Sequence, residues 1–196
     1  MWRIMRIVLT GGPGAGKTTV ARALAARRPD RYVIAPEAAS QVYEQLGTRW
    51  DLLDADGRRD VQRRIYRLQL RQEESLGRLH PNRVMLLDRG SVDGSAYWPD
   101  GPEDYWRQLG TTLEAELARY QLVIWMQSCA AIGLYDGGAS NPCRFESAAD
   151  AIACGEKLRK AWEAHPNLHT VAAVPSPEEK IAAVERILEN HETGPE

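Results

Sequence analysis

Cysteines are few in this sequence, and none is spaced as a zinc ligand. It has three cysteines and four histidines; the cysteines are Cys129, Cys143 and Cys154. They lack C-x-x-C spacing, and the histidines lack the H-E-x-x-H pattern of metalloproteases. An odd number of cysteines also argues against a disulfide framework. We therefore expect a protein of a reducing compartment, the cytoplasm, without a structural zinc site.

Long apolar runs and a large net charge are also absent. No stretch approaches the roughly 18 apolar residues of a membrane-spanning helix, and the apolar run at the N-terminus is too short for a signal peptide. The 196 residues carry a net charge of −2, whereas domains that bind nucleic acid are usually strongly basic. We therefore expect no membrane span and no nucleic-acid partner. The length suits a single domain over residues 1–196, as a monomer or a homodimer.

A glycine-rich stretch near the N-terminus, GGPGAGKTT, fits the Walker A pattern G-x-x-x-x-G-K-[ST]. The β-branched run at 6–10 precedes it and an Ala- and Leu-rich stretch at 19–26 follows it, so the order is strand, loop, helix. Such a loop turns backbone amides toward a phosphate chain, and the helix N-terminus adds partial positive charge. The predicted nucleotide-binding residues are Gly11, Gly12, Pro13, Gly14, Ala15, Gly16, Lys17, Thr18 and Thr19.

Two side chains of this loop have predicted roles in holding the nucleotide. Lys17 should reach the β- and γ-phosphates, and the Thr18 hydroxyl should ligate Mg²⁺. A glycine-rich turn that binds nothing is disfavoured, because the loop, the lysine, the threonine and both flanks agree. We therefore expect ATP and Mg²⁺ as cofactors. GTP stays open, although the absence of N-K-x-D argues against a Ras-like GTPase.

Further apolar runs alternate with helical patterns along the chain. They predict strands at 32–35, 83–88, 121–126 and 169–173, and helices at 37–46, 58–79, 103–120, 147–164 and 177–189. Residues 91–98 read as a short helix or an ordered loop. This alternation predicts an α/β fold with a parallel sheet and helices on both faces. Its ligand should lie at the carboxyl ends of the strands.

Two acidic residues follow strands at that predicted edge. Asp88 is a Walker B-type acid that can hold the Mg²⁺ shell directly or through water; a loop or helix cap is the alternative. Glu37 can take a proton from a substrate hydroxyl, but a carboxylate favoured by the helix dipole explains it equally well. Asp93 is a weaker candidate for the substrate hydroxyl or the metal shell. The general base is either Glu37 or Asp88.

Two arginines are candidates for binding the transferring phosphate. Arg89 follows Asp88 and can grip a substrate or a phosphate through its planar fork. Arg144 lies in a glycine-rich loop, about 128–146, that we predict to close over the site as a lid. An arginine on such a lid would stabilise the charge of the γ-phosphate in transfer. The alternative is a surface ion pair with Glu146 or Asp150.

Two larger groups of side chains have ordinary explanations that we favour. The helix at 58–79 carries a stripe of arginines, for which a solvated face is favoured over a positive wall near an anionic substrate: Arg63, Arg64, Arg67 and Arg71. Four aromatic residues can form a wall against a substrate ring, but core packing or surface scatter is favoured: Trp50, Tyr66, Tyr97 and Trp98.

Four segments together resemble a known family: GGPGAGKTT, PEAA, LLDRGSVDGSAY and NPCRFE. They are similar to the small AAA-type predicted ATPases, which are related to the nicotinamide riboside kinase domain and, more distantly, to deoxynucleoside kinases. The resemblance covers nearly the whole chain. It implies a P-loop NTPase with a five-stranded parallel sheet flanked by helices, as in nucleoside and nucleotide kinases.

The resemblance also implies roles for individual residues. The strand-two glutamate of deoxynucleoside kinases, a general base or ligand of the substrate hydroxyl, falls on Glu37. Their D/E-R-S motif falls on Asp88 and Arg89, although Gly90 follows here. The lid arginine falls on Arg144, the one arginine between Asn141 and Glu146. Nucleotide-kinase lids often carry several arginines, so a hydroxyl is favoured over a phosphate as the acceptor.

These observations predict an ATP- and Mg²⁺-dependent phosphotransferase acting on a small hydroxylated, nucleoside-like molecule. The predicted catalytic residues are Lys17, Glu37, Asp88, Arg89 and Arg144, and the predicted metal ligands are Thr18 and Asp88. The alternative is a regulatory ATPase or GTPase without a small-molecule acceptor. The sequence has no L-S-G-G-Q signature and little room for the second domain of an AAA+ motor, which disfavours a transporter ATPase and a motor.

Overall fold

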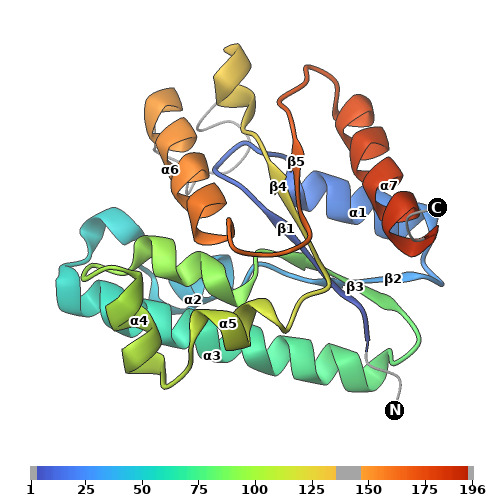
Figure 1. Cartoon of the computed structure of the whole chain (residues 1–196). Helices are drawn as coiled ribbons and strands as arrows, with labels where there is room; N and C mark the ends of the chain where they lie inside the picture. Colours follow the sequence, from blue (N-terminus) through green and yellow to red (C-terminus); the bar gives the residue numbers. More distant parts are fainter. Residues whose placement is uncertain (1–3, 136–146, 194–196) are drawn as a thin grey trace.

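Five parallel strands form the centre of the computed structural model, which describes residues 4–135 and 147–193 (Figure 1). The strands are β1 (Arg6–Thr10), β2 (Tyr32–Ala35), β3 (Val84–Asp88), β4 (Leu122–Met126) and β5 (Leu168–Val171). Their order is β2-β3-β1-β4-β5, and every neighbouring pair is parallel. The predicted α/β class is therefore confirmed. All five strands lie within two residues of their predicted bounds.

Helices and short 3-10 turns connect the strands. The α-helices are α1 (Lys17–Arg27), α2 (Ala38–Leu46), α3 (Ala55–Leu79), α4 (Pro102–Leu109), α5 (Leu113–Leu117), α6 (Ala148–Ala161) and α7 (Pro177–Thr193). The 3-10 turns are η1 (Trp50–Leu52), η2 (Ser91–Tyr97) and η3 (Cys129–Ile132).

One predicted helix is wrong as a single element. The helix expected at 103–120 is divided into α4 and α5, because α4 ends at Gly110 in the left-handed region with φ 69°. The hydroxyl of Thr112 then caps α5 by accepting a hydrogen bond from the backbone N–H of Ala115 at 3.2 Å. A glycine C-cap followed by a threonine N-cap stops one helix and starts the next.

The pleat of the strands divides the core into two layers. Alternate residues such as Ile7 and Leu9 face α1 and α7, whereas Val8 belongs to the apolar cluster on the opposite face. That second cluster is rich in aromatic residues, which come from α4 and from the turns just after η2, α5 and α6. Figure 1 shows α1 and α7 on one side of the sheet and α3, α4 and α5 on the other. The loops that follow β1, β2 and β3 leave the sheet at its carboxyl edge.

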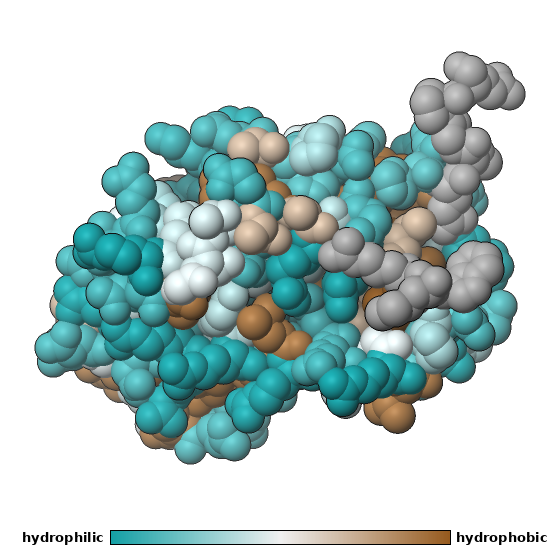
Figure 2. All heavy atoms as spheres, turned by 60° about the horizontal axis from the view of Figure 1, so that its bottom comes forward, coloured by the Kyte–Doolittle hydropathy of each residue, from teal (hydrophilic) through white to brown (hydrophobic). Residues whose placement is uncertain are grey.

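The face over α3 is mainly hydrophilic, with apolar side chains in small separate groups (Figure 2). Exposed large apolar side chains include Leu52 and Leu79, which come from different elements. Scattered apolar residues of this kind are normal on folded proteins. Within residues 4–135 and 147–193, no helix has the length and apolarity to cross a membrane.

Candidate functional site

The glycine-rich loop leaves β1 at the carboxyl edge of the sheet and ends at the first turn of α1. Gly14 and Gly16 have φ values of 72° and 82°, a region that residues with a side chain rarely adopt. Gly16 occupies the N-cap position of α1. Because a glycine N-cap has no side chain to accept the first helical N–H groups, these donors are available to an anion. The local geometry is therefore that of a phosphate loop.

Lys17 begins α1 and folds back over the loop. Its Nζ donates hydrogen bonds to the carbonyl oxygens of Gly11 at 3.0 Å and Gly12 at 3.2 Å. It forms no ion pair within the described part of the chain, although the residue is only 7% exposed. Burial, with Arg89 adding to it, lowers the pKa of Lys17 to about 8 despite the nearby carboxylates. A phosphate would supply the missing counter-charge.

Thr18 and Asp88 meet because β1 pairs with β3, with Leu9 opposite Asp88. The Thr18 hydroxyl donates a short hydrogen bond to Oδ2 of Asp88. The other carboxylate oxygen, Oδ1, is buried and has no hydrogen-bond partner among the described residues. A hydroxyl beside an unsatisfied carboxylate oxygen suits Mg²⁺, which takes oxygen ligands and keeps several from phosphates and water. The residues present therefore fit the predicted ion. The described residues contain no cluster of three or more His, Cys, Asp or Glu that could hold a metal without a nucleotide.

Glu37 precedes α2 and points toward Arg89 across the carboxyl edge. The Nε of Arg89 donates to Oε1 of Glu37 at 2.6 Å, and the Ser40 hydroxyl donates to Oε2 at 2.6 Å. Burial alone would raise the pKa of Glu37, but Arg89, Lys17 and the two hydrogen bonds outweigh it and lower the pKa to about 2. Glu37 is therefore a carboxylate at neutral pH.

Arg89 itself is held in a strained backbone conformation. Its φ of 76° makes it the one residue other than glycine with a positive φ among those described. Such strain persists only where the surroundings hold it, and it concentrates at functional sites. Its Nη1 lies 3.5 Å from Oδ2 of Asp93, and Gln69 donates to its carbonyl oxygen at 3.4 Å.

Asp93 supports Arg89 from the buried side. Its Oδ1 accepts hydrogen bonds from the hydroxyl of Thr10 at 2.8 Å and from Nε1 of Trp162 at 2.5 Å. Burial raises the pKa of Asp93, although Arg89 and these hydrogen bonds oppose the shift. Asp93 thus contacts Arg89 with one carboxylate oxygen and core donors with the other, and its role at the substrate hydroxyl or the metal shell stays a prediction. The sequence did not indicate Trp162, because nothing in the helical pattern of α6 marks one buried indole as a hydrogen-bond donor.

The predicted lid is described only at its start. Residues 136–146, and with them Arg144 and Cys143, lie outside the described residues, so the role of Arg144 stays a prediction. The first part of the segment contacts the phosphate loop, since the Ser128 hydroxyl donates to the carbonyl oxygen of Pro13 at 2.5 Å. The helix after the lid, α6, packs on the same loop, with Gly155 against Gly12.

Lys180 is a buried cation near the phosphate loop that the sequence did not indicate. From α7 its Nζ donates to the carbonyl oxygens of Ala15 at 3.2 Å and Gln127 at 2.8 Å. Burial lowers its pKa. The contact to Ala15 spans 165 positions along the chain, so no local pattern could have predicted it.

The four aromatic candidates divide into two kinds. Trp98 packs in the core against Tyr105, and Tyr66 donates a hydrogen bond to Glu116 at 2.7 Å. Trp50 and Tyr97 instead pair edge to face with ring centroids 5.6 Å apart. The Tyr97 hydroxyl lies 3.0 Å from Sγ of Cys154.

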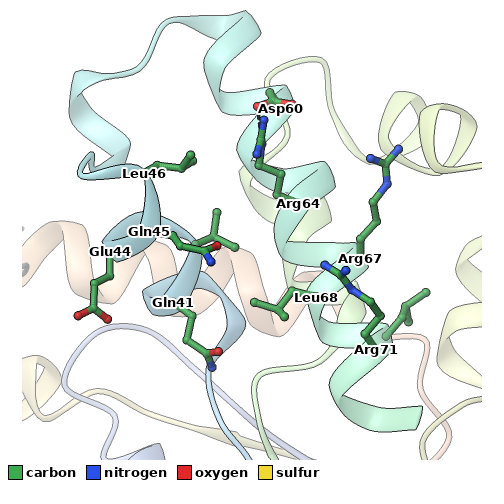
Figure 3. Close-up of a pocket in the computed structure, with 11 residues that line it drawn as sticks. Gln41, Glu44, Gln45, Leu46, Asp60, Arg64, Arg67, Leu68 and Arg71 are labelled. Atoms are coloured by element: carbon green, nitrogen blue, oxygen red, sulfur yellow. Dashed lines mark hydrogen bonds and ion pairs between the residues drawn. The ribbon is translucent and has the colours of Figure 1, made fainter. Parts of the chain in front are cut away.

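The arginine stripe lies away from this site. Arg64, Arg67 and Arg71 line a groove of about 980 Å³ between α2 and α3 (Figure 3). None of Lys17, Glu37, Asp88 and Arg89 lines it. Arg64 pairs with Asp60 at 2.7 Å, and Arg63 donates to Gln108 at 3.1 Å outside the groove. The geometry favours a solvated helix face over a wall of the nucleotide site.

Comparison with known proteins agrees with the fold. A family model described as an AAA domain matches residues 6–180. Among solved structures, a deoxyadenosine kinase from M. mycoides with bound dATP has a TM-score of 0.64 at 15% identity, covering 95% of this chain and 100% of that chain. At this identity the likeness shows the fold alone, which is that of the P-loop kinases. No curated protein matches the sequence.

Proposed function

Because the chain belongs to the AAA domain family whose model spans residues 6–180, we propose that it binds ATP with Mg²⁺ and transfers the γ-phosphoryl group to a hydroxyl of a small, nucleoside-like acceptor. The observation that carries the proposal is the ion pair of Glu37 and Arg89, which holds a half-buried carboxylate at the same sheet edge as the phosphate loop. The charges of Glu37 and Arg89 both act on Lys17, which supports a common site for the three groups. The similar solved structure, a kinase with a bound nucleotide, supports the same proposal.

Each residue then has a defined task. Lys17 would exchange the carbonyl oxygens of Gly11 and Gly12 for the β- and γ-phosphates, which removes its charge imbalance. Thr18 and Asp88 would hold Mg²⁺, which bridges the phosphates and neutralises developing charge. Arg144 would contribute a further positive charge from the lid.

Glu37 would act mainly by orienting the acceptor hydroxyl. A carboxylate with a pKa of about 2 is a weak base, and the loose transition state of phosphoryl transfer requires little proton removal before the bond to phosphorus forms. Glu37 would contribute through its fixed position, since Arg89 and Ser40 each hold one of its carboxylate oxygens. Among the described carboxylates, this favours Glu37 as the partner of the hydroxyl and leaves Asp88 to the metal.

The proposal is tested with purified protein, ATP, Mg²⁺ and a panel of nucleosides and related alcohols. We expect phosphate on an acceptor, and we expect Glu37→Gln to bind ATP normally while acceptor phosphorylation slows roughly 10²-fold. Glu44→Gln changes an exposed carboxylate on α2, the helix that follows Glu37. It is the matched control and should behave as wild type. Hydrolysis that no acceptor changes would instead indicate a regulatory ATPase. Unchanged turnover in Glu37→Gln would remove Glu37 from the site.

A further inference from the structure

Two aromatic side chains, Tyr97 and Trp50, form a wall between the Glu37–Arg89 pair and Arg58 near the start of α3. The Cζ of Arg89 lies 6.0 Å from the ring centroid of Tyr97, whose ring meets Trp50 edge to face. The Cζ of Arg58 lies 4.5 Å from the centroid of Trp50. One wall thus joins two guanidinium groups.

The two guanidinium groups differ in their partners. Arg89 faces the carboxylates of Glu37 and Asp93. Arg58 forms no ion pair within residues 4–135 and 147–193, and its Nε is buried there without a hydrogen-bond partner. A buried guanidinium donor without an acceptor costs free energy unless a ligand completes it. Stacking on Trp50 fixes the plane of the group, and the two terminal nitrogens, which are not among the buried unsatisfied atoms, can bind an anion through two parallel hydrogen bonds.

Tyr43 connects this cation to the proposed reaction centre. Burial is the main reason that the pKa of Tyr43 rises to about 12, and the charges of Arg58, Glu37 and Arg89 all act on the same phenol. One side chain of α2 is therefore within electrostatic reach of both ends of the wall. The Tyr43 hydroxyl is neutral at physiological pH and lies within range of the Arg58 charge.

The position of Arg58 on α3 places it on the helix face that is turned toward Arg89. Residues 58, 62, 65 and 69 share one helix face, and Gln69 on that face bonds the carbonyl oxygen of Arg89. Arg64, Arg67 and Arg71 lie on another face and line the outer groove with α2 (Figure 3). Arg58 is thus distinct from the solvated arginine stripe.

We propose that Arg58, stacked on Trp50, binds an anionic group such as a carboxylate on the acceptor, at the end of the acceptor site opposite Glu37. The acceptor is then a hydroxylated molecule that carries a negative charge away from the hydroxyl it offers. That the bound anion belongs to the phosphate acceptor rests on the proposed function, whereas the anion site itself is tested by binding alone.

The test uses matched ligands that differ only in charge. Calorimetry and acceptor kinetics compare uridine-5-carboxylate with uridine-5-carboxamide, and 2,4-dihydroxybutyrate with its amide. We expect at least one carboxylate to have a Kd about tenfold or more below that of its amide, and a KM lower by a similar factor. One hydrogen-bonded charge pair corresponds to about a tenfold to hundredfold change in affinity. Arg58→Met should remove the preference, Arg58→Lys should keep part of it, and Arg67→Met on the outer face should keep all of it.

The outcomes separate this inference from the kinase proposal. Carboxylate binding that depends on Arg58 without phosphoryl transfer would support the anion site and count against the kinase. Transfer to both forms alike, unchanged in Arg58→Met, would overturn the anion site and leave the kinase standing. Equal or undetectable binding of every carboxylate and amide by wild type would also overturn it. Thermal unfolding and ATP binding of Arg58→Met show whether the variant is folded.

Discussion

At the scale of single residues, the buried lysine of the phosphate loop determines how nucleotide binding depends on pH. Lys17 has carbonyl oxygens as its hydrogen-bond partners, and its pKa falls from 10.5 to about 8 mainly through burial. Phosphate oxygens favour the charged ammonium, so bound nucleotide should raise this pKa again. Between the two pKa values, binding must therefore take up a proton.

We predict that ATP binding at pH 9 takes up a large fraction of one proton per site, and that affinity falls as pH rises above about 8. At pH 7, Lys17 is already charged and uptake should be close to zero. Calorimetry in buffers of different ionisation enthalpy measures the uptake directly. The same small uptake at both pH values would contradict the predicted rise in the pKa of Lys17 on nucleotide binding.

At the scale of elements, the phosphate loop packs closely against α6 because Gly12 and Gly155 have no side chains to separate the two backbones. A Cβ on Gly12 would meet the carbonyl oxygen of Ala151 and lie 3.0 Å from the backbone nitrogen of Gly155. The indole of Trp125 holds Gly155 in place by donating to its carbonyl oxygen at 2.8 Å. Backbone atoms on both sides cannot yield as a flexible side chain would.

We predict that Gly12→Ala destabilises the fold by about 1–3 kcal/mol, as overpacking does, and weakens ATP binding. Gly77→Ala is the control, because this glycine lies inside α3 and its added Cβ makes only an ordinary contact of 3.4 Å with Ile4. That control should stabilise the protein by about 0.5–1 kcal/mol. Denaturant unfolding measures both, and a neutral Gly12→Ala would refute the tight packing.

Elements were predictable from the sequence where local signals agree. The strands were found because short apolar runs alternate with helical patterns, and the phosphate loop because its residue spacing is specific. The prediction of one helix at 103–120 was wrong because the apolar periodicity continues past Gly110, whereas the left-handed conformation of Gly110 ends the helix there. Glu37 and Arg89 were predicted as separate candidates, but their pairing depends on β2 and β3 lying side by side.

At the scale of the whole molecule, the remaining site residues depend on contacts between distant parts of the chain. Trp162 reaches Asp93 across 69 positions, and Lys180 reaches Ala15 across 165. Arg58 was one of many arginines in the sequence, and only its place on Trp50 and its lack of a described partner distinguish it. These contacts can be recognised only in the folded chain, where the sheet order β2-β3-β1-β4-β5 brings distant segments together.

The most direct test of the account is calorimetric titration of the full chain with ATP, with and without Mg²⁺. We predict saturable binding that Mg²⁺ strengthens, and an affinity loss of about tenfold to hundredfold or more in Lys17→Ala, because one charge-assisted contact to phosphate is removed. No binding of ATP or GTP at millimolar concentration with Mg²⁺, or full affinity in Lys17→Ala, would contradict the phosphate site and with it the proposed phosphoryl transfer.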